Sequence, residues 1–216
     1  MGGYDPYSAS KGCSELVTSA YRDSFFHPDT YGKDHHVLLA SVRAGNVIGG
    51  GDWAKDRIIT DLVVAASKGK KLSIRNPAAT RPWQHVLEPL SGYLLLGQRL
   101  LEGDIPCAGA WNFGPGDEGT ITVLDVVNAM QKRWDSVQYA VTQNSNQPHE
   151  ANLLKLDCSK ARAQLNWQPV WDADTCFDKT IFWYKAFYEA GDVFTVDNLD
   201  EYVNQAVRKK LCWAKE

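Results

Sequence analysis

The chain has 216 residues, of which 44% are hydrophobic and 23% are charged, and its formal net charge is −3. This length and composition predict a globular protein of one domain, or one and a half, with a sizeable core. The weak negative charge argues against nucleic acid or an anionic membrane as the main partner, and no apolar run approaches membrane-spanning length. No signal peptide is recognisable at the start, so we expect a cytoplasmic location.

Cysteine and histidine usage argues against disulfide bonds and against a metal site. The five cysteines are odd in number and scattered, and neither a CxxC pair nor a Cys/His cluster occurs. His35 and His36 are adjacent but have no cysteine nearby. We therefore expect reduced thiols and no bound metal.

The first predicted element is a helix from about Tyr7 to Phe26, with apolar residues at helical period and a stop at His27-Pro28. In such a helix Tyr7 and Lys11 are four residues apart and share one face. The lysine charge stabilises a phenolate, so the pair could transfer protons. An ordinary pair on a helix surface has the same spacing, and the spacing by itself favours that interpretation.

A strand is predicted at Val37–Val42, and it leads into a loop over 43–53 with three consecutive glycines. Such a loop is tight and allows another group to approach the backbone. No Gly-Lys-Ser/Thr follows, so it is not a P-loop. An amphipathic helix at Asp56–Lys68 and a strand at Leu72–Arg75 come next.

The segment 79–90 is predicted as a connection that precedes a helix ending at Leu101. It contains Arg81, whose guanidinium group could bind a phosphate through two parallel hydrogen bonds. Arg81 could equally cap the helix or pack on Trp83, and the sequence alone leaves both interpretations open.

A strand at 109–113 is followed by Gly-x-Gly-x-x-Gly at 114–119 and by a helix at Thr122–Trp134 that Thr122 can cap. This order resembles a dinucleotide-binding turn. We reject that interpretation because Pro115 removes an N–H and residues 117–118 are both acidic. The following strand, Val137–Val141, also ends without the acid that would hold a ribose. A loop between layers explains the segment better.

The rest of the chain is predicted as a polar loop at 143–150, a strand at 153–157, a helix at 159–167 and amphipathic helices at 172–188 and 199–213. Alternation of helices and strands predicts an α/β fold.

Five motifs, in order, resemble the extended short-chain dehydrogenase/reductase superfamily. They are Tyr7-Ser-Ala-Ser-Lys11, Arg43-Ala-Gly-Asn46, Thr80-Arg-Pro-Trp83, Trp111-Asn-Phe-Gly114 and Asp157-Cys-Ser-Lys160. The amino-acid sequences of 45–53, 81–90 and 147–151 most resemble those of the CDP-glucose 4,6-dehydratases of that superfamily.

The resemblance implies an incomplete Rossmann-like parallel sheet, of which the chain holds the C-terminal half, and a smaller α/β substrate-binding domain. Residues 1–50 and about 91–120 would belong to the NAD-binding domain. Residues 51–90 and 121–190 would bind the nucleotide sugar, and 191–216 would form a helical tail. Family members carry a glycine-rich NAD loop and a dehydrating acid/base pair upstream of the YxxxK helix. We therefore expect this chain to be a fragment that is inactive alone and exposes an unpaired sheet edge.

The resemblance also implies roles for individual residues. Tyr7 would be the base for the sugar 4-hydroxyl, and Lys11 would hold the nicotinamide ribose of NAD. Asn46 would contact the substrate near its sugar and phosphate. Arg81, with Arg57 as a weaker candidate, would bind the pyrophosphate of a CDP-sugar.

His149 and Glu150 fall where relatives have a phosphate-binding or nucleotide-facing loop, although the sequence of this segment differs from theirs. An epimerase or decarboxylase of the same superfamily, and a nucleotide-sugar binding module without turnover, remain alternatives. We expect the protein to form homo-oligomers, because the exposed sheet edge favours self-association.

Overall fold

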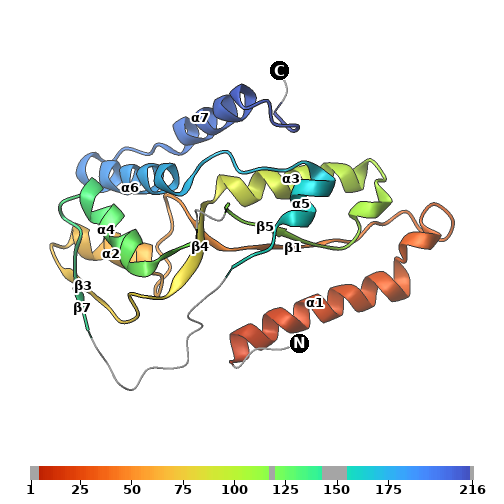
Figure 1. The fold of residues 1–216 in the computed structure, drawn as a ribbon, viewed down its shortest axis with the longest axis horizontal. Coiled ribbons are helices and arrows are strands. Elements are labelled where there is room, and N and C mark those ends of the chain that lie inside the picture. Colours follow the sequence, from red (N-terminus) through yellow and green to blue (C-terminus); the bar gives the residue numbers. More distant parts are fainter. Residues whose placement is uncertain (1–4, 117–119, 143–154, 215–216) are drawn as a thin grey trace.

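The computed structural model describes residues 5–116, 120–142 and 155–214 as an α/β fold (Figure 1). The helices are α1 (Pro6–Phe25), α2 (Ile58–Ser67), α3 (Leu87–Leu101), α4 (Val123–Arg133), α5 (Ser159–Leu165), α6 (Ala173–Ala190) and α7 (Thr195–Arg208), with single turns η1 (Pro28–Thr30) and η2 (Ile105–Cys107). The strands are β1 (Ser41–Ala44), β2 (Asn46–Ile48), β3 (Lys71–Ile74), β4 (Thr80–His85), β5 (Ala110–Phe113), β6 (Thr120–Thr122) and β7 (Gln138–Val141).

The strands form three small sheets in which parallel pairing dominates. β1 pairs with β5, β2 with β4 and β3 with β7, each in parallel, while β6 joins β4 antiparallel. Parallel pairs joined through helices are typical of α/β proteins, so the predicted fold class is confirmed. The division of the chain into domains stays a prediction.

Helix α1 begins where the sequence predicts and lies at the surface of the chain. Asp5 caps it by accepting from the backbone N–H of Ser8 at 2.9 Å, and Pro6 occupies its first turn. None of its residues, all of which the structure describes, is buried. Figure 1 shows α1 along one side of β1 and β5, with α3 and α5 on the other side. Glu15 links the helix to the sheet, because it accepts from Ser41 Oγ at 2.8 Å and pairs with Arg43 at 3.3 Å.

The largest core lies between α2, α4, α6 and the strands β3, β4 and β7. Its buried members include Leu62, Val63, Val126, Val127, Met130, Phe177, Ile181 and Tyr184. A second core joins α3, β5 and α5 through Leu96, Trp111, Phe113 and Trp167. A third holds α7 against the chain that leads into α6, through Val170, Trp171, Tyr202 and Ala206.

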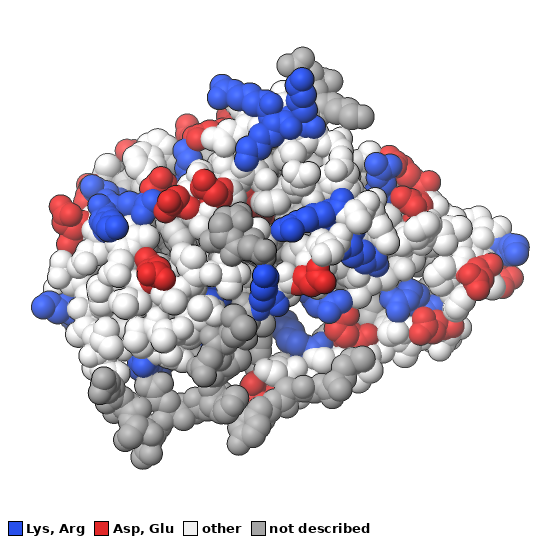
Figure 2. All heavy atoms as spheres, in the orientation of Figure 1, with Lys and Arg blue, Asp and Glu red and all other residues white. Residues whose placement is uncertain are grey.

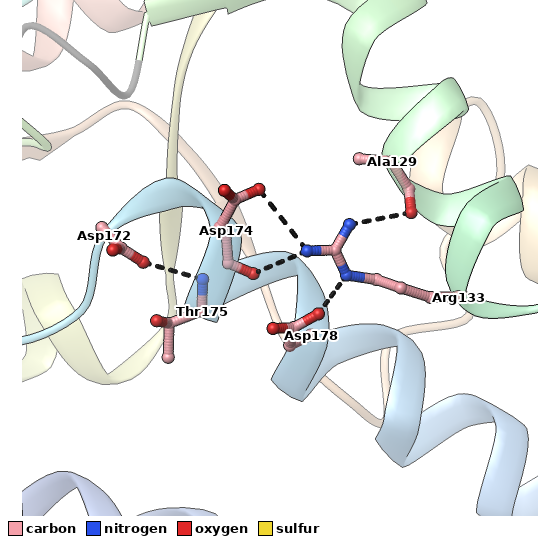
Figure 3. Close-up of polar contacts among 6 residues, drawn as sticks. All are labelled: Ala129, Arg133, Asp172, Asp174, Thr175 and Asp178. Atoms are coloured by element: carbon pink, nitrogen blue, oxygen red, sulfur yellow. Dashed lines mark hydrogen bonds and ion pairs between the residues drawn. The ribbon is translucent and has the colours of Figure 1, made fainter.

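An arginine clamp joins α4 to α6 (Figure 3). The Arg133 guanidinium group bonds to the Asp178 and Asp174 carboxylates and donates to the Ala129 carbonyl at 2.9 Å. Asp172 caps α6 by accepting from Thr175 N at 2.8 Å. The acids are exposed, so the clamp fixes the helix orientation and adds little to stability.

A buried polar network joins α3 to α7. Glu88 is 1% exposed, and its carboxylate accepts from the backbone N–H groups of Val170 and Trp171 at 2.9 and 2.7 Å. Tyr202 donates to the same carboxylate, and Ser91 accepts from Trp167 Nε1 at 3.0 Å. Each partner satisfies a group that would be costly to bury alone.

Several element boundaries differ from the predicted ones. β1 covers 41–44 instead of 37–42, because residues 37–40 have no strand partner and β5 begins opposite Ser41. Residues 46–48 and 80–85, predicted as connections, are the paired strands β2 and β4. Pro82 lies opposite Thr120 in the last pair of the β4–β6 register. A proline is tolerated at such a position because its missing N–H interrupts no ladder beyond it. Residues 155–157 are not in a strand, and α7 begins and ends earlier than predicted.

The loop that contains Gly49, Gly50 and Gly51 lies against the protein's own core. A Cβ on Gly50 would lie 2.0 Å from the Trp183 ring, which is 4% exposed. The expected close approach is therefore real, and a buried indole of α6 makes it.

Acidic and basic side chains alternate over the face in Figure 2 without a large region of one sign. No helix among the residues that the structure describes is long and apolar enough to cross a bilayer.

Candidate active site

A cleft of ≈ 1100 Å³ lies where α1, β2, α2, β3 and β4 come together. Four of the residues that the sequence singled out line it, namely Tyr7, Asn46, Arg57 and Arg81. These residues are up to 74 positions apart in the chain, so the fold assembles the site. A cleft of this volume is large enough for a nucleotide-sized ligand.

Tyr7 and Lys11 are neighbours, as their spacing predicts. Lys11 Nζ lies 5.5 Å from the centre of the Tyr7 ring. Tyr7 is 72% exposed, and it lies on the first turn of α1 at the cleft. Lys11 is one turn further along α1 and is not among the residues that line the cleft. The arrangement presents a phenol to the cleft with an ammonium group behind it.

Two parallel strands bring Asn46 and Arg81 together. β2 and β4 pair so that Asn46 lies opposite Trp83, two residues from Arg81. Arg81 Nη1 donates to its neighbour's carbonyl, that of Thr80, at 2.8 Å. Trp83 is 3% exposed and also lines the cleft, and its Nε1 has no hydrogen-bond partner among the residues that the structure describes.

Arg57 sits at the entrance to α2 and pairs with Asp52. Arg57 Nη1 lies 3.2 Å from Asp52 Oδ2, and the arginine side chain is 62% exposed. Tyr184 holds this loop in place, because its hydroxyl accepts from Asp52 N at 3.0 Å and donates to the Asp52 carbonyl at 2.6 Å. Burial raises the pKa of Tyr184 to about 12, so it acts as a neutral anchor.

His149 and Glu150 lie outside the described residues, and their assignment stays a prediction. The cleft also contains charged residues that the sequence analysis did not single out, among them Asp52, Lys55, Asp61 and Arg75. Two signals point to the last two. Asp61 follows Arg57 by one helical turn, and Arg75 directly follows a parallel strand, where α/β proteins bind ligands.

The glycine-rich segment at 114–119 includes residues 117–119, which lie outside the described residues, but the described elements on either side of it are strands of different sheets. β5 pairs with β1, whereas the next element, β6, pairs with β4 in another sheet. Helix α4 begins only after β6, where Thr122 caps it by accepting from Asp125 N at 3.1 Å. This supports the interpretation of the segment as a connection between layers.

A domain of nucleotide-sugar-modifying enzymes matches this chain over most of its length. The family model described as GDP-mannose 4,6 dehydratase matches residues 2–180. The chain therefore belongs to the GDP-mannose 4,6-dehydratase family.

Two curated relatives come from Salmonella typhimurium. A CDP-glucose 4,6-dehydratase is 49% identical over 96% of this chain and 58% of its own length. A dTDP-glucose 4,6-dehydratase is 23% identical over 84% of this chain and 47% of its own length. The chain thus spans about half the length of the curated relatives it matches.

Solved structures of similar fold include two from Bacillus. The dTDP-glucose 4,6-dehydratase of Bacillus anthracis in complex with NAD has a TM-score of 0.66 and 18% identity, over 88% of this chain and 55% of that one. The UDP-glucuronic acid 4-epimerase of Bacillus cereus, in complex with UDP-glucuronic acid and NAD, has a TM-score of 0.68 and 19% identity, over 85% of this chain and 54% of that one. At these identities the likeness shows the shared Rossmann-type fold.

Proposed function

We propose that the whole protein is an NAD-dependent 4,6-dehydratase that converts CDP-glucose to CDP-4-keto-6-deoxyglucose and water. The observation that carries this proposal is that Tyr7, Asn46 and Arg81 line one cleft, with Lys11 beside the tyrosine ring. The 49% identity to the Salmonella CDP-glucose 4,6-dehydratase supports the reaction and the nucleotide.

In this proposal Tyr7 removes the proton from the sugar 4-hydroxyl. Its exposed phenol can reach a ligand in the cleft, and Lys11 at 5.5 Å stabilises the negative charge that the phenolate carries. Asn46 would orient the sugar from the neighbouring strand β2 through its amide group.

Arginine side chains would hold the diphosphate. Arg81 is partly buried in the cleft wall, where a guanidinium group gains more from a phosphate than it does in bulk water. Arg57 is more exposed and already pairs with Asp52, so its contribution would be smaller.

The Tyr7–Lys11 pair fits the nicotinamide ribose of NAD, because a hydroxyl and an ammonium group together can donate to and accept from ribose hydroxyls. NAD, when bound, supplies the hydride acceptor and donor for the sugar. The glycine run at 49–51 lies between β2 and α2, but Gly50 packs directly against the Trp183 ring, so it does not offer the open turn that a pyrophosphate needs. We propose that the 216-residue chain alone does not retain NAD; equimolar NAD in the purified chain would refute this.

A chimera tests the reaction. The part of the Salmonella CDP-glucose 4,6-dehydratase that aligns with this chain is replaced by this chain, and formation of the 4-keto product is measured with CDP-glucose. We expect turnover, and we expect Tyr7→Phe to reduce it by about 10²-fold or more, the size typical of lost proton transfer. Tyr21→Phe makes the same chemical change on the same helix, at a residue outside the cleft walls, and should leave turnover unchanged.

The outcomes separate the alternatives. Epimerised sugar as the product would support an epimerase and overturn the dehydratase. Binding of CDP without turnover in the chimera would support a binding module. Near-normal turnover of Tyr7→Phe would remove Tyr7 from the chemistry.

We also propose that the protein self-associates through α1. Leu16, Val17, Tyr21 and Phe25 on this helix are 49%, 57%, 54% and 64% exposed, and covering them would bury apolar surface. Light scattering should show a dimer or larger species that Val17→Glu dissociates. A monomer at every accessible concentration would overturn this proposal.

A further inference from the structure

The wall of the cleft contains an acidic and a basic side chain from different elements. Asp61 lies in the first turn of α2, and Arg75 directly follows β3. Both line the cleft, α2 packs on β3, and the arginine charge acts on the Asp61 carboxyl. Apolar residues also line the cleft, among them Ile58, Leu72, Ile74 and Val123.

An acid needs an explanation in a cleft that would hold a diphosphate, because it repels the phosphates. Asp52 has one, since it pairs with Arg57 at 3.2 Å and accepts from Ala54 N at 2.8 Å. Asp61 is half-buried, its carboxylate accepts from the backbone N–H of Asp56, and the charge of Arg75 acts on it. Burial still raises the pKa of the carboxyl, with the charge of Asp56 adding to the effect. A carboxylate that has lost part of its hydration gains more from a donor on a ligand than an exposed one does.

The cytosine ring presents the matching pattern. Its N4 amino group donates, while N3 and O2 accept, so a carboxylate can accept from N4 and a guanidinium group can donate to the neighbouring acceptors. Uracil and thymine carry the acceptor O4 in place of N4 and a donor at N3. Either base would place O4 against the carboxylate.

We propose that Asp61 and Arg75 read the base of the nucleotide, and that Asp61 selects cytosine over uracil and thymine by accepting from its N4 amino group. The apolar residues of the cleft wall would contact the faces of the cytosine ring, and Asp61 and Arg75 would contact its edge. This inference rests on the proposed function, because it takes the ligand of the cleft to be a nucleotide sugar. It adds the residues that decide which nucleotide is accepted.

An unrelated role for Asp61 is stabilisation of the α2 N-terminus, where a negative charge is favourable. That role predicts a loss of stability on Asp61→Asn with no change in base preference. The two roles are therefore separated by measuring binding of different bases instead of stability alone.

The test is calorimetry of the 216-residue chain with CDP, UDP and dTDP. We expect CDP to bind about tenfold more tightly than UDP, the size expected for one good base contact. Asp61→Asn should bring the two within about twofold, because an amide can accept from N4 or donate to O4. Asp56→Asn removes a charge from the same cleft and should keep the preference for CDP.

A modified ligand gives a second readout that does not depend on folding of a variant. N4,N4-dimethyl-CDP cannot donate from N4, so the unaltered chain should bind it as weakly as UDP. Equal affinities for CDP and UDP, an unchanged preference in folded Asp61→Asn, or the absence of nucleotide binding would each overturn the inference. Turnover of CDP-glucose by the chimera in any of these cases would leave the proposed function standing.

Discussion

Tyr202 donates its hydroxyl hydrogen to Glu88 Oε2 at 2.9 Å and so joins helices that are 114 residues apart in sequence. The contact is enclosed, since Glu88 is 1% and Tyr202 2% exposed. The tyrosine ring also stacks on Trp213, at 5.8 Å between ring centres. The pair anchors α7 beside the start of α3, directly after the strand that carries Arg81.

Tyr202→Phe should destabilise the chain. It removes the donor to a buried carboxylate while keeping the ring and its packing, and the expected loss is about 1–3 kcal/mol of unfolding free energy. Urea denaturation measures it. Tyr139→Phe is the matched control, because Tyr139 donates to the neutral Asn128 amide at 2.7 Å and sits in a less enclosed place. A loss for Tyr202→Phe no greater than for the control would contradict the assigned role of the pair.

The pH dependence of stability should reflect two buried groups with opposite slopes. Burial raises the pKa of Glu88 to about 7, so the folded chain binds more protons than the unfolded one between about 4.5 and 7, and this contribution to stability is lost as pH rises through that range. Burial lowers the pKa of His85 to about 4, so its contribution increases from about pH 4 to 6.5. Shifts of this size each correspond to about 3 kcal/mol and oppose one another.

Glu88→Gln should reveal the contribution of His85 to the pH dependence of the unfolding free energy. Without the glutamate, the unfolding free energy should rise with pH between about 4 and 6.5, whereas the unaltered chain should change much less over that range. Urea denaturation at several pH values measures both slopes. Glu102→Gln, at an exposed residue that pairs with Arg99 at 3.5 Å, should leave the slope unchanged. Equal slopes for Glu88→Gln and the unaltered chain would show that the Glu88 proton does not govern this dependence.

Gly50→Ala should be strongly destabilising. The added methyl group would overlap the Trp183 ring, which cannot move freely because it stacks on Phe187 and donates to Thr195 Oγ1 at 2.9 Å. Overpacking of this kind costs about 1–3 kcal/mol or more. Gly97→Ala is the matched control in the middle of α3, where a Cβ meets nothing within 4 Å, and should stabilise by about 0.5–1 kcal/mol. A thermal melt compares the two, and a tolerated Gly50→Ala would show that the loop can move away from α6.

The sequence predicted the fold class, most helices and the Tyr7–Lys11 pair because these depend on local periodicity. A four-residue spacing on a capped helix fixes two side chains on one face whatever the rest of the chain does. The family resemblance then placed Asn46 and Arg81 in the site, and the structure puts both in the wall of the cleft.

Strands β2 and β4 could not be predicted in the same way. Both are short, and β4 contains a proline, so their strand character comes from pairing with each other across 37 residues, as in Asn46 opposite Trp83. The same holds for Asp61 and Arg75, which share the cleft because α2 packs on β3.

For this protein the sequence by itself determined the chemistry available at the cleft, since side-chain types and helix spacing are local properties. The tertiary structure alone decided which charges share the cleft, which glycine meets Trp183 and which carboxylate is buried beside Tyr202. These are relations between distant segments, and burial and distance in the folded chain set their energies.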